Sequence, residues 1–411
     1  MAERVMNREK GEMKRQGIDG VMPAGTDVVA RAEALIPLLR ERAAQTSAEA
    51  RLPDETIADM DAAGLFSMTI PRRYGGLQTD ITTYMNAVVA LGRGDPSAAW
   101  VATIININNW FLSALYPPET TEEVFSTPGA RTAAVLSPRS CKSRRVDGGF
   151  VIEEGIWGFN SGVYHSQWEM LGFPVIEDGV HQYDALALMP TSNVEFLDDW
   201  DTIGIRGSGS TSVRVRDIFV PDARIGRADL ARQGIYPSTQ LDDEWLYRSA
   251  FTPLGQIIIA FPALGAGLGA LDMFMNGLAK RGIAATQYKN QAEAPVTHLQ
   301  IGEASAKIDA ARTIIAAAAA EIEKAAQAGR PMAPLDRARI RRDTGFADRL
   351  IWEGVDKLAD ASGGSFASVR HPLGRYWHDA RIASLHATLV PSTVYELYGR
   401  MMCGMEPAGN V

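Results

Sequence analysis

The 411-residue sequence has little cysteine and lacks most short motifs that identify common enzyme classes. Its two cysteines, Cys141 and Cys403, are too few for a disulfide framework or a four-thiolate metal site, and such sparse use is typical of a reducing cytoplasm. The sequence contains no GxxxxGKS/T phosphate loop, no GxGxxG fingerprint after a strand, and no HExxH, CxxC or GxSxG pattern. These absences argue against the common nucleotide-binding loops, zinc sites and serine-hydrolase elbows.

Histidines are few and badly spaced for a metal. His378 and His386 are eight residues apart, whereas two ligands on one helix chelate a metal at a spacing of four. We therefore predict no metal site. Gly265, Gly267 and Gly269 fall within an apolar helical run, where they predict close helix packing rather than a phosphate loop.

The chain also lacks a basic surplus and a targeting signal. Its net charge of −8 argues against a nucleic-acid partner. Residues 1–25 alternate in charge without an apolar core, which predicts a flexible tail rather than a signal peptide. Residues 254–274 are nearly all apolar but include Gln256, Pro262 and Asp272, which favours a buried core helix over a membrane span. We expect a cytoplasmic protein without a membrane partner.

Three zones of periodicity predict an α+β fold. Residues 26–130 show helical spacing, with a loop at residues 71–77 (PRRYGGL). Residues 131–232 contain short β-type runs separated by turn signals, which predict a small antiparallel barrel or sandwich. Residues 233–411 are helical again, with long helices expected at 295–328, 337–361 and 377–402.

The first motif with chemical meaning is residues 155–162 (GIWGFNSG). If these residues continue a strand, Trp157, Phe159 and Ser161 share one face. Two flat aromatic rings and a hydroxyl suit a planar heteroaromatic ligand, with the hydroxyl bonding to a ring nitrogen. An aromatic pair that fills a barrel core explains the same residues equally well.

The second motif is residues 204–211 (GIRGSGST). Its glycines allow backbone N–H groups to approach an anion, and Arg206 and the hydroxyl groups add donors. A glycine-rich hairpin loop is an equally good explanation from the residues alone.

Together, these motifs and the α–β–α order resemble the acyl-CoA dehydrogenase superfamily over roughly residues 28–405. PRRYGGL at 71–77, HPLGR at 371–375 and DAR at 379–381 add to the resemblance. It implies an N-terminal helical domain, a middle β-barrel or sandwich that holds flavin, and a C-terminal four-helix bundle, assembled as a homotetramer.

The dehydrogenase branch of that superfamily uses a glutamate as its base. The two positions where it would fall read Ala387-Thr388 and Gly255-Gln256 here, so the base for proton abstraction is missing. The oxygenase components of two-component flavin-dependent monooxygenases are more similar. Their pattern W-x-F-x-S-G-x-x-H-x-x-W is met from Trp157 to Trp168, RGSGS at 206–210 resembles their RGTGS, and His386 matches their late-helix histidine.

This resemblance implies a specific chemistry. A separate NAD(P)H:flavin reductase supplies reduced FMN or FAD, and dioxygen adds to the flavin to give a C4a-hydroperoxide. One oxygen atom then passes to an aromatic or heteroaromatic molecule, or to an amine. Ser161 would bond near flavin N5 in a dry site, and His386 would act on the substrate or the peroxide. Asn108 stands where related phenol hydroxylases carry a histidine.

The resemblance also implies site residues, with Gly363 and Gly364 lent to a neighbouring subunit. Two other functions stay open: an acyl-CoA dehydrogenase or oxidase with a displaced base, and an inactive flavin-fold binding protein. The implied set comprises catalytic groups (His386, Ser161, Asn108), flavin contacts (Trp157, Phe159, Ser161, Gly162, Arg206, Ser208, Ser210, Gly363, Gly364) and substrate contacts (Asn108, Trp110, Tyr74, His165).

Overall fold

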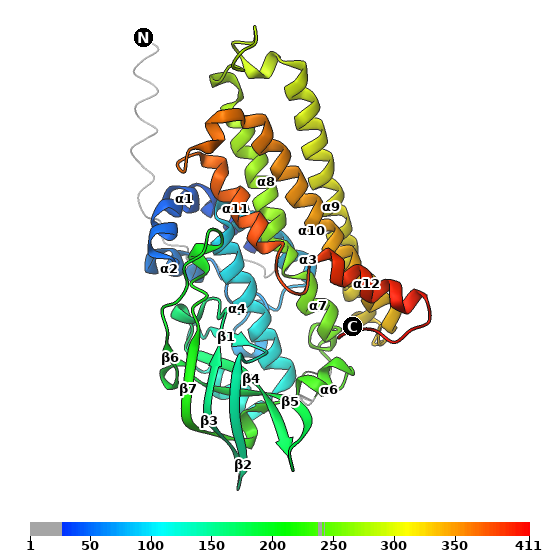
Figure 1. Ribbon diagram of the computed structural model, residues 1–411. Coiled ribbons are helices and arrows are strands. Elements are labelled where there is room, and N and C mark those ends of the chain that lie inside the picture. Colours follow the sequence, from blue (N-terminus) through cyan, green and yellow to red (C-terminus); the bar gives the residue numbers. More distant parts are fainter. Residues whose placement is uncertain (1–26, 237–240, 242) are drawn as a thin grey trace.

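The computed structural model describes residues 27–236, 241 and 243–411, and the expected tail at 1–25 lies outside these residues. A helical segment comes first, a β segment follows, and long helices complete the chain, as the periodicity predicts. Figure 1 shows the strands at one end of the molecule and α9 and α10 extending toward the other, with α4 running from the helices down to the sheets.

The N-terminal helices are positioned by their caps and by one central helix. The Asp80 carboxylate accepts from the Thr83 N–H at the start of α3, and the Asp95 carboxylate accepts from the Ser97 N–H at the start of α4. Helix α4 is mostly apolar and almost entirely buried, so its side chains contact both the other helices and the β segment. The helices are α1 Asp27–Glu49, α2 Asp54–Ala62, α3 Ile81–Gly94, α4 Pro96–Leu115 and α5 Pro118–Phe125.

The β segment forms two four-stranded sheets around a common apolar core. One sheet has the order β1-β4-β5-β8 and the other β2-β3-β7-β6. Phe150 from one sheet meets Phe173 from the other edge-on, at 5.2 Å between ring centroids. The strands are β1 Thr132–Val135, β2 Ser140–Val146, β3 Gly149–Trp157, β4 Trp168–Glu177, β5 Val180–Pro190, β6 Glu195–Phe196, β7 Val213–Pro221 and β8 Ile225–Gly226.

Three sequence expectations for these strands are wrong. Strands β1 and β4 pair in parallel, so the segment is not wholly antiparallel. The short β-type runs read from the sequence do not include residues 140–146, which form β2, because this strand is mostly exposed and polar and leaves no apolar alternation to read. The strand expected to reach Phe159 ends at Trp157, because Phe159 adopts a left-handed backbone with φ of +62°.

The apolar stretch after residue 250 forms α7 Phe251–Ile257 and α8 Ala260–Gly277. A helical region at 251–280 is long and apolar enough to cross a membrane, but 78% of its most apolar window is buried inside the fold. A side chain on Gly265 would place its Cβ 2.7 Å from the Cα of Gly92 in α3, so the glycines allow the close helix contact expected from the sequence.

The C-terminal helices confirm most of the expected boundaries and correct one. The single helix expected at 377–402 is broken, because residues 384–390 form turns. Pro391 starts the next helix and keeps Val390 out of helical geometry, with ψ of 115°. Helices α8 to α11 pack along one another (Figure 1). The remaining helices are α6 Ala228–Arg232, α9 Pro295–Gln327, α10 Pro334–Ser362, α11 Pro372–Ala383 and α12 Pro391–Met402.

Candidate active site

A chain of hydrogen bonds joins α4 to the two glycine-containing motifs. The Trp100 indole N–H donates to Ser161 Oγ at 3.0 Å. Ser161 Oγ lies 2.7 Å from Ser210 Oγ, which lies 2.6 Å from Ser208 Oγ. Ser208 donates to the Ile205 carbonyl at 2.7 Å. The structure therefore brings together three hydroxyl groups that the sequence singled out in two separate motifs.

His386 lies beside this chain, in the turns between α11 and α12 rather than on a helix. Its ring centroid is 5.9 Å from that of Trp100. Burial lowers the pKa of His386 to about 4, so its imidazole is neutral near pH 7. The Thr388 backbone N–H points at Nδ1 at 3.4 Å, which favours the tautomer with hydrogen on Nε2. The Thr388 hydroxyl also contacts Nδ1, at 2.8 Å.

The glycine-rich turn holds Ile205 in a strained conformation. Ile205 is β-branched yet has φ of +51°, a region that such residues rarely adopt. Its N–H donates to Asp379 Oδ1 of α11 at 2.6 Å. A Cβ on Gly207 would lie 2.1 Å from the Thr46 side chain, so the turn approaches α1 too closely for any other residue.

Arg206 is engaged within the protein. Its Nε donates to the Ser47 carbonyl at 3.0 Å, and one terminal nitrogen contacts Asp201 at 2.9 Å and the Thr202 carbonyl at 2.7 Å. These contacts tie the turn to α1. The role of Arg206 toward a flavin remains a prediction.

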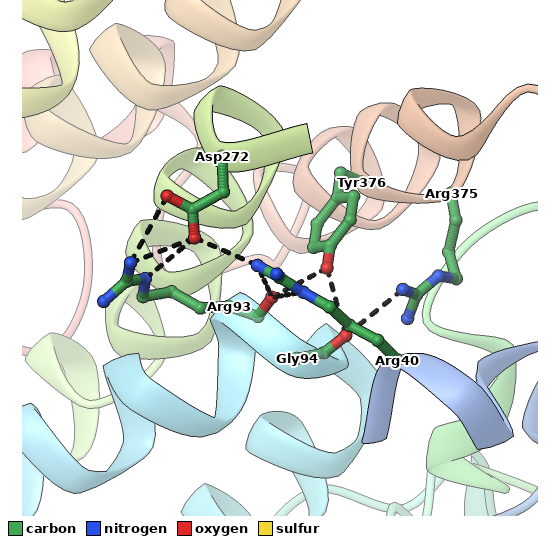
Figure 2. Close-up of polar contacts among 6 residues, drawn as sticks. All are labelled: Arg40, Arg93, Gly94, Asp272, Arg375 and Tyr376. Atoms are coloured by element: carbon green, nitrogen blue, oxygen red, sulfur yellow. Dashed lines mark hydrogen bonds and ion pairs between the residues drawn. The ribbon is translucent and has the colours of Figure 1, made fainter. Parts of the chain in front are cut away.

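A buried polar network supports the turn from the opposite side. Asp379 and Asp95 are both buried, and Arg375 lies 3.4 Å from Asp95. Burial, reinforced by the nearby Asp95 charge, raises the pKa of Asp379 to about 7. Figure 2 shows the adjoining contacts, in which Tyr376 donates to the Arg93 carbonyl at 2.7 Å, so that α11 is fastened to the end of α3.

The same network continues to α1 and α8 (Figure 2). Arg40 bonds to the Arg93 carbonyl and to Asp272, and Arg93 forms a second ion pair with Asp272 at 3.0 Å. Four helices therefore meet where Asp379 and Arg375 emerge from α11.

The two aromatic residues of the first motif diverge, which corrects the expected common face. Trp157 is fully buried in the β core, and its indole donates to the Gly172 carbonyl at 2.7 Å. Phe159 is 71% exposed in this chain and packs edge-on against Trp200. Their divergence follows from the end of β3 at Trp157, because alternation of side chains ceases there. Contacts of either residue with a flavin remain predictions.

The expected substrate residues lie in different surroundings. Asn108 donates from α4 to the Thr132 carbonyl of β1 at 3.1 Å, and Trp110 donates to the Leu246 carbonyl at 2.8 Å. The Tyr74 ring packs at a tilt against Phe125, with ring centroids 5.5 Å apart. His165 is buried, its Nε2 has no hydrogen-bond partner among the described residues, and burial lowers its pKa to about 4. Their substrate roles stay predictions.

Gly162 and the pair Gly363–Gly364 serve different backbone needs. Gly162 has φ of +76° and starts the short turn that carries His165, which explains the glycine there. Gly363 also has a positive φ, at the C-terminal end of α10. A Cβ at either Gly363 or Gly364 would have no neighbour within 4 Å in this chain.

Two buried groups near the motifs were not singled out from the sequence. Trp100 lies in the helical run of α4, and nothing in the sequence predicts its hydrogen bond to Ser161. Glu169 of β4 is fully buried, neither carboxyl oxygen has a hydrogen-bond partner of good geometry among the described residues, and burial raises its pKa to about 8. A contact with the Asn160 amide opposes this shift.

These residues offer one free hydrogen-bond acceptor at Ser161. Ser161 accepts from Trp100 and retains a second lone pair, and its surroundings are buried. The neutral imidazole of His386, beside Trp100, is a further polar group in this region. The arrangement supplies hydrogen-bond groups without a charged side chain, in surroundings that are mostly buried.

Comparison with known proteins places the chain in a family. The acyl-CoA dehydrogenase N-terminal domain model matches residues 32–115, and the C-terminal domain model matches residues 257–391. The oxygenase subunit HsaA of a flavin-dependent monooxygenase from Rhodococcus jostii is 31% identical over 90% of this chain and 96% of its own. The oxygenase component of an FADH2-dependent resorcinol hydroxylase from a Rhizobium strain is 28% identical over 93% of this chain and 95% of its own.

A solved structure agrees. XiaF from Streptomyces, in complex with FADH2 and glycerol, is 30% identical, has a TM-score of 0.86, and is matched over 93% of this chain and 96% of its own. The fold and the paired motifs define an acyl-CoA dehydrogenase-like flavoprotein. Within that class, the chain belongs to the family of oxygenase components of flavin-dependent monooxygenases.

Proposed function

We propose that this protein hydroxylates a small aromatic or heteroaromatic molecule, or an amine, with dioxygen and a reduced flavin. A separate NAD(P)H:flavin reductase supplies the flavin, as the names of the related oxygenase components imply. The observation that carries the proposal is the buried assembly of Trp100, Ser161 and His386, formed by α4, the turn after β3 and the turn after α11. When bound, reduced flavin supplies the electrons that activate dioxygen.

The protein's own residues would bind the flavin, orient the substrate and keep water out of the site. Ser161 would offer a hydrogen-bond acceptor to the flavin N5, and its burial would keep water from competing for it. His386 has too low a pKa to remove a proton from a phenol near pH 7. Its Nε2–H instead donates a hydrogen bond that orients an oxygen of the substrate.

The experiment adds reduced FMN or FAD, under anaerobic conditions, to the purified protein and then mixes it with ¹⁸O-labelled dioxygen and a panel of phenols, indoles and aromatic amines. The expected result is a product that carries one labelled oxygen atom. If all electrons appear as hydrogen peroxide with every compound, and Ser161→Ala behaves like wild type, the proposal is wrong. Bleaching of bound oxidised flavin by an acyl-CoA would instead identify the dehydrogenase activity.

Several further features belong to the same proposal. We expect a homotetramer with the middle sheets as a sandwich and the C-terminal helices as a four-helix bundle, divided at residues 26–130, 131–232 and 233–411. Gly363 and Gly364 are exposed in a single chain, which supports a role in a neighbouring subunit's flavin site. We expect the protein to act in the cytoplasm without a nucleic-acid or membrane partner.

A further inference from the structure

A buried acid and a buried amide meet inside the β segment. The Glu169 side chain of β4 and the Asn160 side chain, in the turn after β3, are both completely buried and contact each other. Among the described residues, none of their four polar side-chain atoms has a hydrogen-bond partner elsewhere. A polar group without a partner is costly in such a core, so the two side chains depend on each other.

The surroundings of Glu169 are apolar. Its neighbours across the sheet are Ala133 of β1 and Met189 of β5, and both belong to the β core. The titratable side chains on the surrounding strands that are not fully exposed are those of Cys141, Glu153, Tyr183, Asp184 and Arg214. Those in the adjoining turns are Arg131, Tyr164 and His165. None of these groups contributes to the pKa of Glu169, which burial raises to about 8.

The protonated form of Glu169 is complementary to the Asn160 amide. An amide donates through its NH2 group and accepts through its oxygen, and a protonated carboxyl group likewise has one donor and one acceptor. A carboxylate can only accept, so it would leave Asn160 Oδ1 without a donor and place a charge in the β core. The raised pKa agrees with this pairing, because it keeps Glu169 protonated near pH 7.

Asn160 lies in the turn that presents Ser161. The Asn160 N–H donates to the Thr211 carbonyl at 3.2 Å, which joins this turn to the end of the glycine-rich motif. The preceding residue, Phe159, has φ of +62°, a conformation that persists where the surrounding contacts hold it. The Asn160 side chain anchors the turn in the β segment, while the next residue, Ser161, bonds to Trp100 of α4.

We propose that protonated Glu169 is a positioning residue for Ser161: it holds the Asn160 amide inside the β segment, and loss of its proton releases the turn that carries the Ser161 hydroxyl. Glu169 acts through Asn160 rather than on a substrate. The turn is held below about pH 8 and released as the pH rises through that value, because the pKa of the acid is raised. The consequence for catalysis rests on the proposed function, whereas the consequence for the turn does not.

Hydrogen–deuterium exchange of the flavin-free protein measures the turn directly. Glu169→Gln is the test variant, because its amide can pair with Asn160 as the protonated acid does but cannot ionise. The measured quantity is the ratio of the wild-type to the variant exchange rate at residues 158–162, in which the intrinsic effect of pH cancels. We expect a ratio near one at pH 6 and a rise of roughly three- to tenfold at pH 9, the effect of one neutral hydrogen bond. A ratio that stays near one at pH 9 would overturn the inference.

Two controls separate the turn from the segment as a whole. Glu154→Gln removes an exposed acid of β3, and the exchange of this variant at residues 158–162 should equal that of wild type at both pH values. Residues 185–189 of β5 are buried in the same segment, and their exchange ratio should stay near one. An equal rise at residues 185–189, or the same change in Glu154→Gln as in Glu169→Gln, would show general loosening and refute a specific role for Glu169.

The second measurement is the fraction of reduced flavin that is lost as hydrogen peroxide, followed from pH 6 to pH 9 with an accepted substrate. This fraction should rise through about pH 8 in wild type and stay level in Glu169→Gln. If exchange responds but the peroxide fractions of the two proteins agree, Glu169 does not position Ser161 and the inference fails. If wild type oxygenates no compound at any pH, the proposed function fails, and the exchange ratio still decides whether Glu169 holds the turn.

Discussion

The side chain of Asp379 and the backbone of Ile205 form a 2.6 Å hydrogen bond between residues that are 174 positions apart. The bond connects α11 to the strained turn on which the hydroxyl groups of Ser208 and Ser210 depend. The chain of hydrogen bonds from Trp100 therefore ends in the helical part of the fold. A substitution of Asp379 should therefore affect the position of Ser161, although the two residues are not hydrogen-bonded to each other.

Replacing Asp379 tests this connection. Asp379→Ala leaves the Ile205 N–H unpaired in a buried turn and should lower the free energy of unfolding by about 1–3 kcal/mol. Asp379→Asn retains an oxygen that accepts from Ile205, so it should lose much less. Urea unfolding measures both variants. If Asn is as damaging as Ala, the charge opposite Arg375 matters rather than the bond to Ile205.

Trp100→Phe should loosen Ser161 while preserving most of the packing. The variant keeps an aromatic ring beside His386 but removes the N–H that bonds to Ser161. We expect the fraction of reduced flavin that is lost as hydrogen peroxide to rise severalfold, because the hydroxyl is no longer held in place. Peroxide released per flavin oxidised is the measurement.

Trp377→Phe is the control for Trp100→Phe. The Trp377 indole also donates a hydrogen bond, to Asp356 at 2.9 Å, but it lies outside the chain of hydrogen bonds through Ser161. The peroxide fraction of this variant should match wild type. An equal rise in both variants would point to a general loss of rigidity.

The pH dependence of activity should distinguish a donor from a base at His386. With its pKa near 4, His386 stays neutral as the pH rises from 6 to 8, so it should add no step to the kcat profile in that range. His386→Gln retains an N–H donor and should keep more activity than His386→Ala. A kinetic step near pH 7 that disappears in both variants would contradict the donor role.

The sequence predicted the order of the elements and the long helices, and it singled out three hydroxyl groups that the structure brings together. Helix α9 was expected at residues 295–328 and is observed at Pro295–Gln327, because isoleucines at intervals of seven leave little ambiguity. Ser161, Ser208 and Ser210 were all named, since they occur in glycine-containing motifs.

The sequence could not predict contacts between distant elements. Trp100 and Asp379 join the chain of hydrogen bonds through Ser161 only because α4 and α11 pack beside the β segment. The periodicity of the sequence does not encode this packing. The shared face of Trp157 and Phe159 failed for a local reason, because one left-handed residue ended the strand. His386 was assigned to a helix because the break at residues 384–390 has no glycine to mark it.

Glu169 should make the protein less stable as the pH rises. Its pKa is about 8 in the folded protein and near 4.5 when exposed, so between these values the folded state holds one more proton than the unfolded state. The contribution of Glu169 to the free energy of unfolding is complete below about pH 4.5 and is lost as the pH rises through 8, at about 1.4 kcal/mol per pH unit.

Glu169→Gln tests this dependence, because the variant keeps the shape of the protonated acid but cannot ionise. The variant should therefore gain about 2–3 kcal/mol relative to wild type between pH 6 and pH 8. Urea unfolding at several pH values measures this gain, with the exposed Glu154→Gln in the same segment as the control. Parallel stability curves for Glu169→Gln and wild type would show that Glu169 is ionised in the folded protein at pH 6.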